Sequence, residues 1–464
     1  MTDNSTSIAT IRFSRFDVIV GAILAGLLGL TLLFIWRGDR VGVQIVGTQP
    51  AHGTTNNAIN TVIQVDFDQV IAASDQIIPL SFTPSVGGTF EWNETSLIFT
   101  PSLPLQSNTL YTVSLTDQLE NDQGRPVQGQ LNWQFQTRAP RLIYLAPDEN
   151  QNQQLYIMDP SEGAPRQLTE ASLGVYDYAL SSDGEQVGYA VLREDGGSDL
   201  WSITIEDAKS TELLTCPDAV CSGISWLPDT QQRLIYERRT MLVPGAAPGP
   251  PRLWWLSISE NQTVPVFDDN QLLGYGAGWS ADGRWLGYVS PTNQGVQLYN
   301  VDNGSTFTIP SRMGGPPVWN PRNNTLLVAD VQSVDSGFAV HLLRAAPDGG
   351  ALEDISGPSE LVEDGSPAWS PDGSWVAVMR KTAGSAMGKQ LWIMRADGSD
   401  ARPLTNDEDL HYALPAWSPD GQSIAFQRIS LKELGARPSL WLLDLESEQI
   451  QLLAELGSRP VWMP

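Results

Sequence analysis

Residues Pro367–Lys381 read PAWSPDGSWVAVMRK, and residues Pro415–Arg428 read PAWSPDGQSIAFQR. The tryptophans of the two copies are 48 residues apart, and each is followed by the turn SPDG and a second apolar run. Self-similarity at a spacing of this size is typical of repeat architectures, in which each copy is one supersecondary unit. These two copies therefore indicate how the larger part of the chain is organised.

Weaker copies of the same unit occur along the chain at spacings of 40 to 53 residues. Aligned on the residue before the turn, the copies are centred on Leu180, Trp226, Trp279, Trp319, Trp369, Trp417 and Trp462. A complete copy has four apolar runs separated by short turns, and four strands in about 45 residues is the pattern of a propeller blade. We expect a seven-bladed β-propeller over residues 140–464.

The two ends of this region complement each other. Residues 141–169 supply strands two to four of a blade but no first strand, and the last residues, SRPVWMP from Ser458 to Pro464, supply one. Pairing the two ends would remove an exposed sheet edge. We expect the C-terminal strand to close the propeller.

The units resemble the TolB-like propeller repeat. The likeness lies in WSPDG at Trp369–Gly373 and Trp417–Gly421, and in third strands similar to the LYIMD that begins at Leu155. TolB itself has six blades, so a seventh departs from that pattern. The resemblance implies an all-β propeller, and similar propellers occur in lyases and as the substrate-gating part of serine peptidases.

Residues 41–138 form a different, smaller domain. Short alternating runs such as YTVSL and WQFQT, separated by Gly, Pro and Asn, are typical of an antiparallel β-sandwich. With TQPAHG, VDFDQVI, SLIFTPSLPL and NDQGRPV, they resemble the bacterial Ig-like domains of S-layer and other envelope proteins. That resemblance implies a spacer or docking module.

A single stretch near the N-terminus is long enough to cross a membrane. Val18–Trp36 holds 19 residues without a charge, about 28 Å of helix, which matches the hydrocarbon core of a bilayer. We expect a short cytoplasmic tail over residues 1–16 and a transmembrane helix over residues 17–36. No cleavage site of the signal-peptide kind precedes Arg37, so we expect an uncleaved anchor.

The charges beside this helix do not decide its orientation. Two arginines, Arg12 and Arg15, precede it and two, Arg37 and Arg40, follow it, a tie under the positive-inside rule. Small residues four apart in the helix could pair two copies as a weak homodimer. These small residues are Gly21, Ala25 and Gly29.

The net charge and the two cysteines indicate which classes of partner and which cellular compartment to expect. A formal net charge of −26 makes nucleic acid and anionic lipid surfaces poor partners. The only cysteines, Cys216 and Cys221, are too few to ligate zinc, and a disulfide between them would require an oxidising compartment. We therefore expect the cytoplasmic membrane, with the N-terminus inside and both β domains outside.

Two recurring residue types in the repeats have structural roles. Asp-Gly is what a tight hairpin needs to reach positive φ, and tryptophans at one blade position fill the space between sheets. We therefore assign packing to the tryptophans and turn formation to the repeated aspartates, with no metal site. These aspartates are Asp183, Asp282, Asp372 and Asp420.

One face of the propeller has connections that vary from blade to blade, including the long Met241–Pro251, so it is the candidate binding face. Residues near the entry to the first strands would rim the central channel, either as a binding rim or as solvated charge. The candidate binding residues are Tyr176, Asp177, Tyr275, Glu363, Asp364, Asp407, Asp409, His411, Tyr412 and Arg459, with Glu408 beside them.

The leading functional hypothesis is a membrane-anchored extracytoplasmic binding or scaffold protein whose propeller engages a protein or an envelope glycan. It assigns no catalytic residue and no cofactor, because G-x-S-x-G is absent and the propeller has only His341 and His411 as histidines. One alternative is a lyase-like or hydrolase-like propeller enzyme acting on an extracellular polymer, although the sequence ends at Pro464 without a hydrolase domain. The other alternative is a ligand sensor that signals through the membrane helix.

Overall fold

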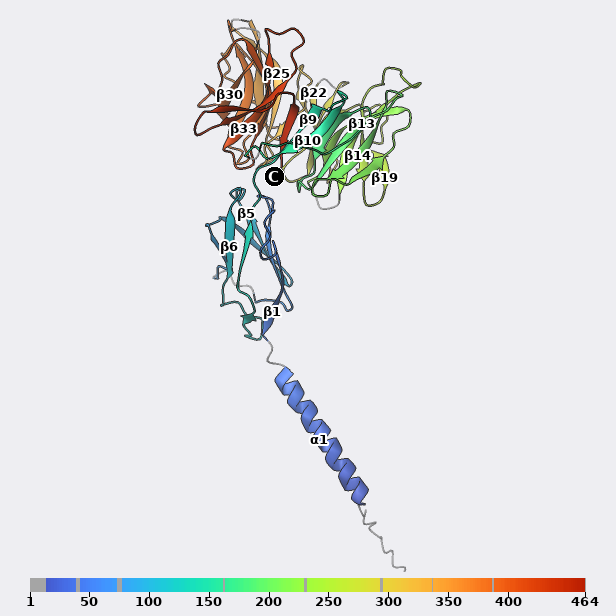
Figure 1. Cartoon of the computed structure of the whole chain (residues 1–464), viewed down its shortest axis with the longest axis vertical. Helices are drawn as coiled ribbons and strands as arrows, with labels where there is room; N and C mark the ends of the chain where they lie inside the picture. Colours follow the sequence, from blue (N-terminus) through green and yellow to red (C-terminus); the bar gives the residue numbers. More distant parts are fainter. Residues whose placement is uncertain are drawn as a thin grey trace, which may run out of the picture. The chain divides into compact units, whose positions relative to one another are not determined.

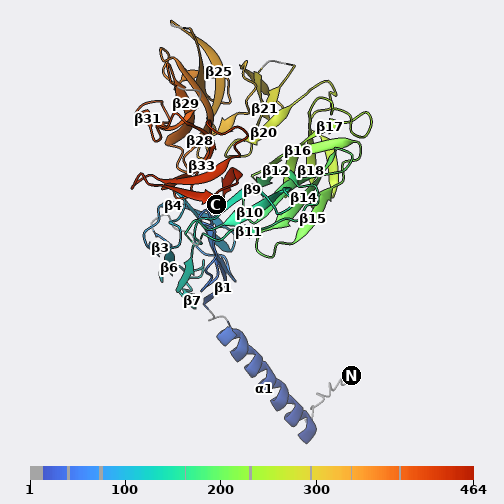
Figure 2. The same cartoon turned by 45° about the horizontal axis from the view of Figure 1, so that its top comes forward.

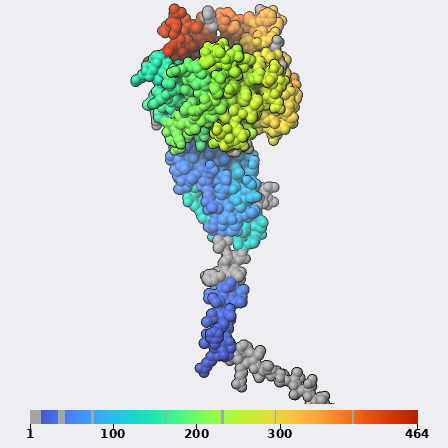
Figure 3. All heavy atoms as spheres, turned by 90° about the vertical axis from the view of Figure 1, so that its right-hand side faces the viewer, coloured from blue at the N-terminus to red at the C-terminus, as the bar shows by residue number. Residues whose placement is uncertain are grey.

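The computed structural model describes residues 14–38, 42–72, 77–161, 163–228, 232–292, 295–335, 337–385 and 388–463. Within these ranges it has one helix, α1 (Arg15–Gly38), and the remaining elements are strands (Figure 1). The apolar side chains of α1 from Phe16 to Leu33 are largely exposed (Figure 3), and the helix is long and apolar enough to cross a membrane. Residues 1–13 of the expected tail, including Arg12, lie outside the described residues, as do Arg40 and the side chains of Trp36 and Arg37.

The first β unit is a sandwich of two sheets, which confirms the expected fold. One sheet has the order β4-β5-β2-β1-β7 and the other the order β3-β6-β8. Phe82 of one sheet contacts Phe99 of the other with ring centroids 4.5 Å apart, and Trp133 is also buried in this unit. The strands are β1 (Val43–Gln49), β2 (Ile63–Phe67), β3 (Leu80–Thr83), β4 (Gly88–Asn93), β5 (Ser96–Pro101), β6 (Leu110–Leu115), β7 (Val127–Gln128) and β8 (Asn132–Gln136).

The second unit is an all-β propeller, as expected, and its described strands form seven groups of four. From the inner strand outward, blade 1 is β36 (Ser458–Trp462), β9 (Leu142–Pro147), β10 (Gln153–Met158) and β11 (Arg166–Gln167); blade 2 is β12 (Val175–Leu180), β13 (Gln186–Leu192), β14 (Ser198–Thr204) and β15 (Ser210–Leu214); blade 3 is β16 (Ala219–Trp226), β17 (Arg233–Thr240), β18 (Arg252–Ser257) and β19 (Gln262–Pro265).

The remaining blades follow the same order. Blade 4 is β20 (Tyr275–Trp279), β21 (Trp285–Ser290), β22 (Gly295–Asn300) and β23 (Thr306–Pro310); blade 5 is β24 (Val318–Trp319), β25 (Leu326–Val334), β26 (Gly337–Ala345) and β27 (Glu353–Asp354); blade 6 is β28 (Val362–Trp369), β29 (Trp375–Thr382), β30 (Gln390–Arg395) and β31 (Arg402–Pro403); blade 7 is β32 (Leu410–Trp417), β33 (Ser423–Ser430), β34 (Ser439–Asp444) and β35 (Ile450–Ala454).

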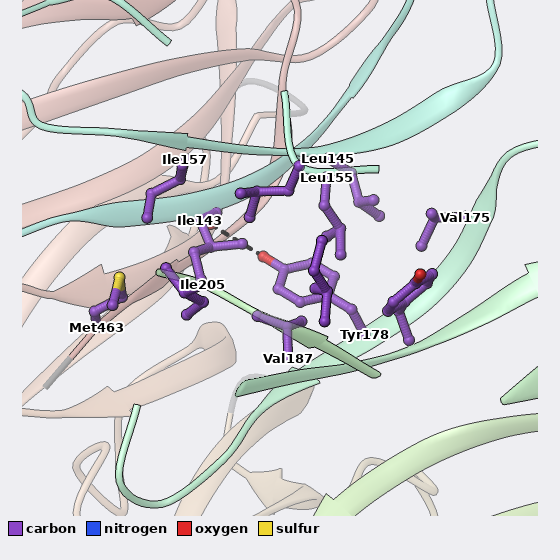
Figure 4. Packing of buried hydrophobic residues seen from close by; sticks show 12 residues of the cluster. Ile143, Leu145, Leu155, Ile157, Val175, Tyr178, Val187, Ile205 and Met463 are labelled. Atoms are coloured by element: carbon purple, nitrogen blue, oxygen red, sulfur yellow. Dashed lines mark hydrogen bonds between the residues drawn. The ribbon is translucent and has the colours of Figure 1, made fainter. Parts of the chain in front are cut away.

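The C-terminal strand β36 pairs antiparallel with β9, so strands from both ends of the propeller segment share blade 1. In Figure 2, β9 lies between the blade of β33 and the blade of β12. An apolar cluster that includes Ile143 and Leu145 of β9 joins blades 1 and 2 (Figure 4). The hydroxyl of Tyr178 in this cluster donates to the carbonyl of Ile143 at 3.1 Å and to that of Arg459.

Two pairs of blades also share backbone hydrogen bonding. A short parallel pairing of Ser198 with Val220 links blade 2 to blade 3, and one of Val340 with Glu363 links blade 5 to blade 6. Each link turns two four-stranded blades into one eight-stranded sheet. The sequence repeat does not predict these links, because they join the third strand of one blade to the inner strand of the next and occur at only two of the blade junctions that the structure describes.

The repeated tryptophans connect neighbouring blades by hydrogen bonds. At five blade positions the indole Nε1 donates to a backbone carbonyl on the inner strand of the preceding blade, at 3.0–3.1 Å. The donors are Trp226, Trp319, Trp369, Trp417 and Trp462. Besides the packing role expected for them, these tryptophans therefore link neighbouring blades by hydrogen bonds.

Trp279 occupies the same blade position, but it does not form the inter-blade hydrogen bond within the described part of the chain. Its buried Nε1 has no partner among the described residues, whereas Nε1 of Trp417 donates to Ala368 at 3.0 Å. Both Trp→Phe variants lose similar ring volume, so Trp417→Phe should lower the free energy of unfolding by about 1 kcal/mol more than Trp279→Phe. Urea unfolding of the two variants measures the difference, and equal losses would show that the inter-blade bond contributes nothing.

The Asp-Gly turns are built by their own side chains. In SPDG, Ser370 Oγ donates to Asp372 Oδ1 at 2.5 Å, and the same oxygen accepts the Ser374 N–H at 3.1 Å. Gly373 has φ 70°, a conformation that glycine adopts without strain. Burial opposes ionisation, but the hydrogen bonds from Ser370 and Ser374 hold the pKa of the Asp372 carboxyl below its usual value. The repeated aspartates serve the turns, as predicted.

Cys216 and Cys221 form a disulfide at the entry to blade 3. Both residues are fully buried. Asp199 Oδ1 accepts the N–H of Cys216 at 2.7 Å, and Arg193 donates to the Cys216 carbonyl at 2.7 Å. The disulfide is therefore buried between blades 2 and 3 rather than exposed at the tip of a loop.

Candidate functional site

The inner strands share an irregularity three residues before the repeat tryptophan. The antiparallel register shifts there, as at a β-bulge, in the inner strands β16, β20, β28, β32 and β36. In each of the five strands, the residue at the bulge has a left-handed backbone conformation. These residues are Gly223 (φ 62°), Gly276 (φ 62°), Ser366 (φ 47°), Leu414 (φ 49°) and Arg459 (φ 56°).

Three of the five are not glycine, which is unusual for this conformation. A residue with a Cβ is strained in the left-handed region by roughly 1–2 kcal/mol. Such strain persists where the surrounding structure enforces it, and it concentrates at functional sites. Ser366, Leu414 and Arg459 lie on the inner strands of blades 6, 7 and 1, so the strained positions are neighbours in the propeller.

A cavity of about 520 Å³ lies where these inner strands meet. All three strained residues line it, together with the adjoining prolines and small apolar residues of blade 5. The lining residues are Gly315, Pro316, Val318, Leu327, Ala329, Ser366, Pro367, Leu414, Pro415, Arg459, Pro460 and Val461. We call this space the inner cavity, and its wall is mainly apolar.

Arg459 is the one charged residue of the inner cavity. Its guanidinium forms an ion pair with Asp177 of blade 2, and its backbone N–H donates to Gln427 Oε1 of blade 7 at 3.0 Å. Asp177 also accepts the N–H of Gly223 in blade 3 at 2.7 Å. The charge of Arg459 is therefore compensated, and the Arg459–Asp177 pair crosses the junction of blades 1 and 2.

Other predicted rim residues lie near the inner strands but line no part of this cavity. Tyr275 donates its hydroxyl to the Gly314 carbonyl at 2.8 Å, and Tyr176 is about half exposed on β12. Glu363 forms an ion pair with Lys381, with Oε1 and Nζ 3.6 Å apart.

The acidic connection before β32 holds two more of the predicted rim residues. Asp407 accepts the N–H of Asp409 at 3.0 Å, and Asp409 pairs with Lys432. His411, on β32, accepts the N–H of Lys389 at its Nδ1, at 3.2 Å. Among the described residues, no group of three or more His, Cys, Asp or Glu is placed to hold a metal ion.

For two of the residues, the predicted position at the rim of the channel is wrong. Asp364 is 1% exposed, and its carboxylate accepts two hydrogen bonds of 2.7 Å from Arg380 and one of 2.5 Å from Ser356. Tyr412 is 3% exposed and packs in the apolar core between blades 6 and 7. Alternation along the inner strands places both side chains between blades rather than in the channel.

Sequence reasoning also missed most of the inner cavity, although the repeats carry a signal for it. The residue pairs three and two positions before four of the tryptophans are Pro-Pro, Ser-Pro, Leu-Pro and Arg-Pro. In all four, the first residue lines the cavity. A proline recurring inside what is otherwise a strand indicates a bulge, and this pattern could have located the site.

A family model and several solved structures are similar to parts of this chain. Residues 39–137 match the family model of the bacterial Ig-like domain. No curated protein matches the chain. The solved structure of TolB from Acinetobacter baumannii is similar over 83% of this chain and 83% of its own, at 14% identity and a TM-score of 0.44.

The solved structures of a puromycin-hydrolysing peptidase and of a puromycin hydrolase are similar to part of this chain. A puromycin-hydrolysing peptidase of Mycobacterium tuberculosis matches 70% of this chain and 55% of its own, at 15% identity and a TM-score of 0.50. The S511A mutant of a puromycin hydrolase matches 68% of this chain and 52% of its own, at 15% identity and a TM-score of 0.52. This chain thus spans about half the length of each peptidase, and at such identities the likeness shows the fold alone.

Proposed function

We propose that the protein is a membrane-tethered extracytoplasmic binding protein that captures a partner protein at the inner cavity of its propeller. The observation that carries the proposal is the convergence of three strained non-glycine residues, Ser366, Leu414 and Arg459, on one apolar cavity. Glycine adopts the left-handed conformation of these bulges without strain, as it does at Gly223 and Gly276. Retaining side chains there supports a role in binding.

The chemistry of the wall favours a protein side chain over a glycan. A sugar ring carries several hydroxyl groups, and burying each without a hydrogen bond is costly. Only Ser366 and Arg459 of the lining residues have polar side chains, and Arg459 is already paired with Asp177. An aliphatic or aromatic side chain of a partner loses no hydrogen bonds on entering such a cavity.

Three features support the tether and the location outside the cytoplasm. Helix α1 is long and apolar enough to serve as the anchor. The Cys216–Cys221 disulfide requires an oxidising compartment. The Ig-like domain of residues 39–137 fits a spacer between the anchor and the propeller.

We further propose that binding, not catalysis, is the activity of the propeller. Asp177, Glu363 and Asp409 each form an ion pair with a basic side chain of the protein, so these carboxylates are already engaged within the propeller. His341 is fully buried and both of its ring nitrogens face protein oxygens.

A Leu414→Gly variant tests the binding role. Glycine relieves the left-handed strain but adds flexibility to the unfolded chain, so the free energy of unfolding should change by less than about 1 kcal/mol. Losing the leucine from the cavity wall should weaken partner capture about tenfold. The measurement is quantitative recovery of cross-linked neighbours from intact cells that produce the full chain.

The matched control is Leu452→Ala, on the outer strand β35, where the leucine is 46% exposed. It should leave recovery of neighbours unchanged. If Leu414→Gly recovers the same neighbours in the same amounts as the wild-type chain, the inner cavity is not the binding site.

A further inference from the structure

A lysine without an ion pair among the described residues lies against the inner strand of blade 6, and a residue of that strand lines the inner cavity. Lys389 precedes β30, and its Nζ lies 3.0 Å from the position that a Cβ on Gly365 would take. Gly365 is followed by Ser366, which lines the cavity. The ammonium group therefore lies against the residue that precedes Ser366 on β28. The absence of a side chain on Gly365 gives it room.

The carboxylates closest to Lys389 are engaged elsewhere. Glu363 forms an ion pair with Lys381, and Asp364 accepts hydrogen bonds from Arg380 and Ser356. In the part of the chain that the structure describes, Lys389 Nζ has no ion pair or hydrogen bond. Lys389 is thus a half-buried cation that is only partly compensated, by carboxylates that pair with other groups, in a protein whose net charge is −26.

The electrostatics of Lys389 agree with this geometry. Burial lowers the pKa of its ammonium group, and although Glu363 and Asp364 act in the opposite direction, the pKa stays below its ordinary value. The charged form is therefore under-compensated in the free protein. A bound anion would supply the missing compensation.

His411, whose Nδ1 accepts the backbone N–H of Lys389 at 3.2 Å, offers a second donor group close to this lysine. Because the backbone N–H of Lys389 donates to Nδ1, the neutral ring carries its proton on Nε2. Burial, and then the charge of Lys389, lower the pKa of His411, so the ring is neutral at pH 7. Nε2 has no protein partner among the described residues and remains available to donate.

We propose that Lys389 and His411 bind a carboxylate of the ligand whose apolar side chain occupies the inner cavity. This inference rests on the proposed function and adds the charge of the partner segment to it. One ammonium and one neutral N–H match a singly charged carboxylate, which accepts from both at once. The carboxylate is either the C-terminus of the partner or an acidic side chain beside an apolar one.

The test uses the full chain in lipid nanodiscs, with ligand-observed NMR and empty nanodiscs subtracted. The probes are N-acetylleucine, N-acetylleucinamide and the amide of N-acetyl-Asp-Leu. Wild-type protein should bind at least one of the two acids about tenfold more tightly than the neutral amide. Whichever acid binds more tightly identifies a chain-end or a side-chain carboxylate.

Three variants at the site and one control variant identify the residues responsible for the preference. Lys389→Met should remove the preference for the acid while leaving the affinity for N-acetylleucinamide unchanged, and Lys209→Met, on the turn after β14, should change neither. His411→Asn keeps an acceptor for the Lys389 N–H and removes the Nε2–H donor, so it should reduce the preference partly. Gly365→Ala should also reduce it, because the new Cβ displaces the flexible end of Lys389.

The outcomes separate this inference from the proposed function. If wild-type protein binds acids and amide equally while Leu414→Gly weakens both, the carboxylate site is overturned and the cavity stands. If Lys389→Met removes the preference but Leu414→Gly has no effect on any probe, the carboxylate site stands and the cavity fails. If neither acid binds saturably, or Lys389→Met leaves the preference intact, the inference is wrong.

Discussion

An Asp364→Ala variant is expected to lose about 3–5 kcal/mol of unfolding free energy, because it leaves a buried guanidinium without its counter-charge. The side chains of Asp364 and Arg380 are 0% and 5% exposed. Ser356, from the connection that enters blade 6, donates to the same carboxylate. The variant therefore also leaves a buried hydroxyl without its acceptor, and urea unfolding of the full chain measures the loss.

The neighbouring residue on the same strand is the matched control. Glu363 is 52% exposed and pairs with Lys381 at 3.6 Å, so Glu363→Ala should cost less than about 1 kcal/mol. Replacing both buried partners, as Asp364→Leu with Arg380→Met, should recover much of the loss. Equal, small losses for Asp364→Ala and Glu363→Ala would contradict the structural role given to this network.

Deleting residues 458–464 should be more damaging than any single substitution. The deletion removes β36, leaves the edge of β9 unpaired and strips the apolar cluster between blades 1 and 2 of Met463. Trp462 is 9% exposed and donates to Ala416 at 3.0 Å. Loss of a buried tryptophan alone costs about 3–5 kcal/mol, so the propeller should unfold or aggregate through the open edge.

A synthetic peptide of residues 457–464, added in excess, provides the control for this deletion. If β36 acts by pairing with β9, the peptide should restore the thermal transition of the truncated chain in a concentration-dependent way. A truncated chain with an unchanged melting temperature would show that the pairing of the chain's ends does not hold the propeller together.

The blades could be predicted from sequence because their signals are local. The Asp-Gly turn, the apolar run and the tryptophan of each copy lie within about a dozen residues, and each has a defined role in one hairpin. The same locality explains why β36 was recognised as a first strand, since SRPVW has the form of the other copies. The bacterial Ig-like segment was recognised in the same way.

The site was harder to predict because its contacts join distant parts of the chain. Arg459 and Asp177 form one ion pair across 282 residues, and no local pattern indicates it. Asp364 and Tyr412 lie on the same kind of strand as the cavity residues, but their side chains point between blades. Only the recurring proline before the tryptophan carried local information about the cavity, and its meaning depends on the bulge.

The measurement that tests the central claim most directly is photo-crosslinking from inside the cavity in intact cells. A photo-reactive amino acid is placed at Leu414, and in a second strain at Leu452 on the outer strand. We predict that position 414 gives a discrete adduct with one envelope protein, and that position 452 does not give this adduct. Identical adducts from both positions, or none from position 414, would contradict the claim that the inner cavity captures a partner.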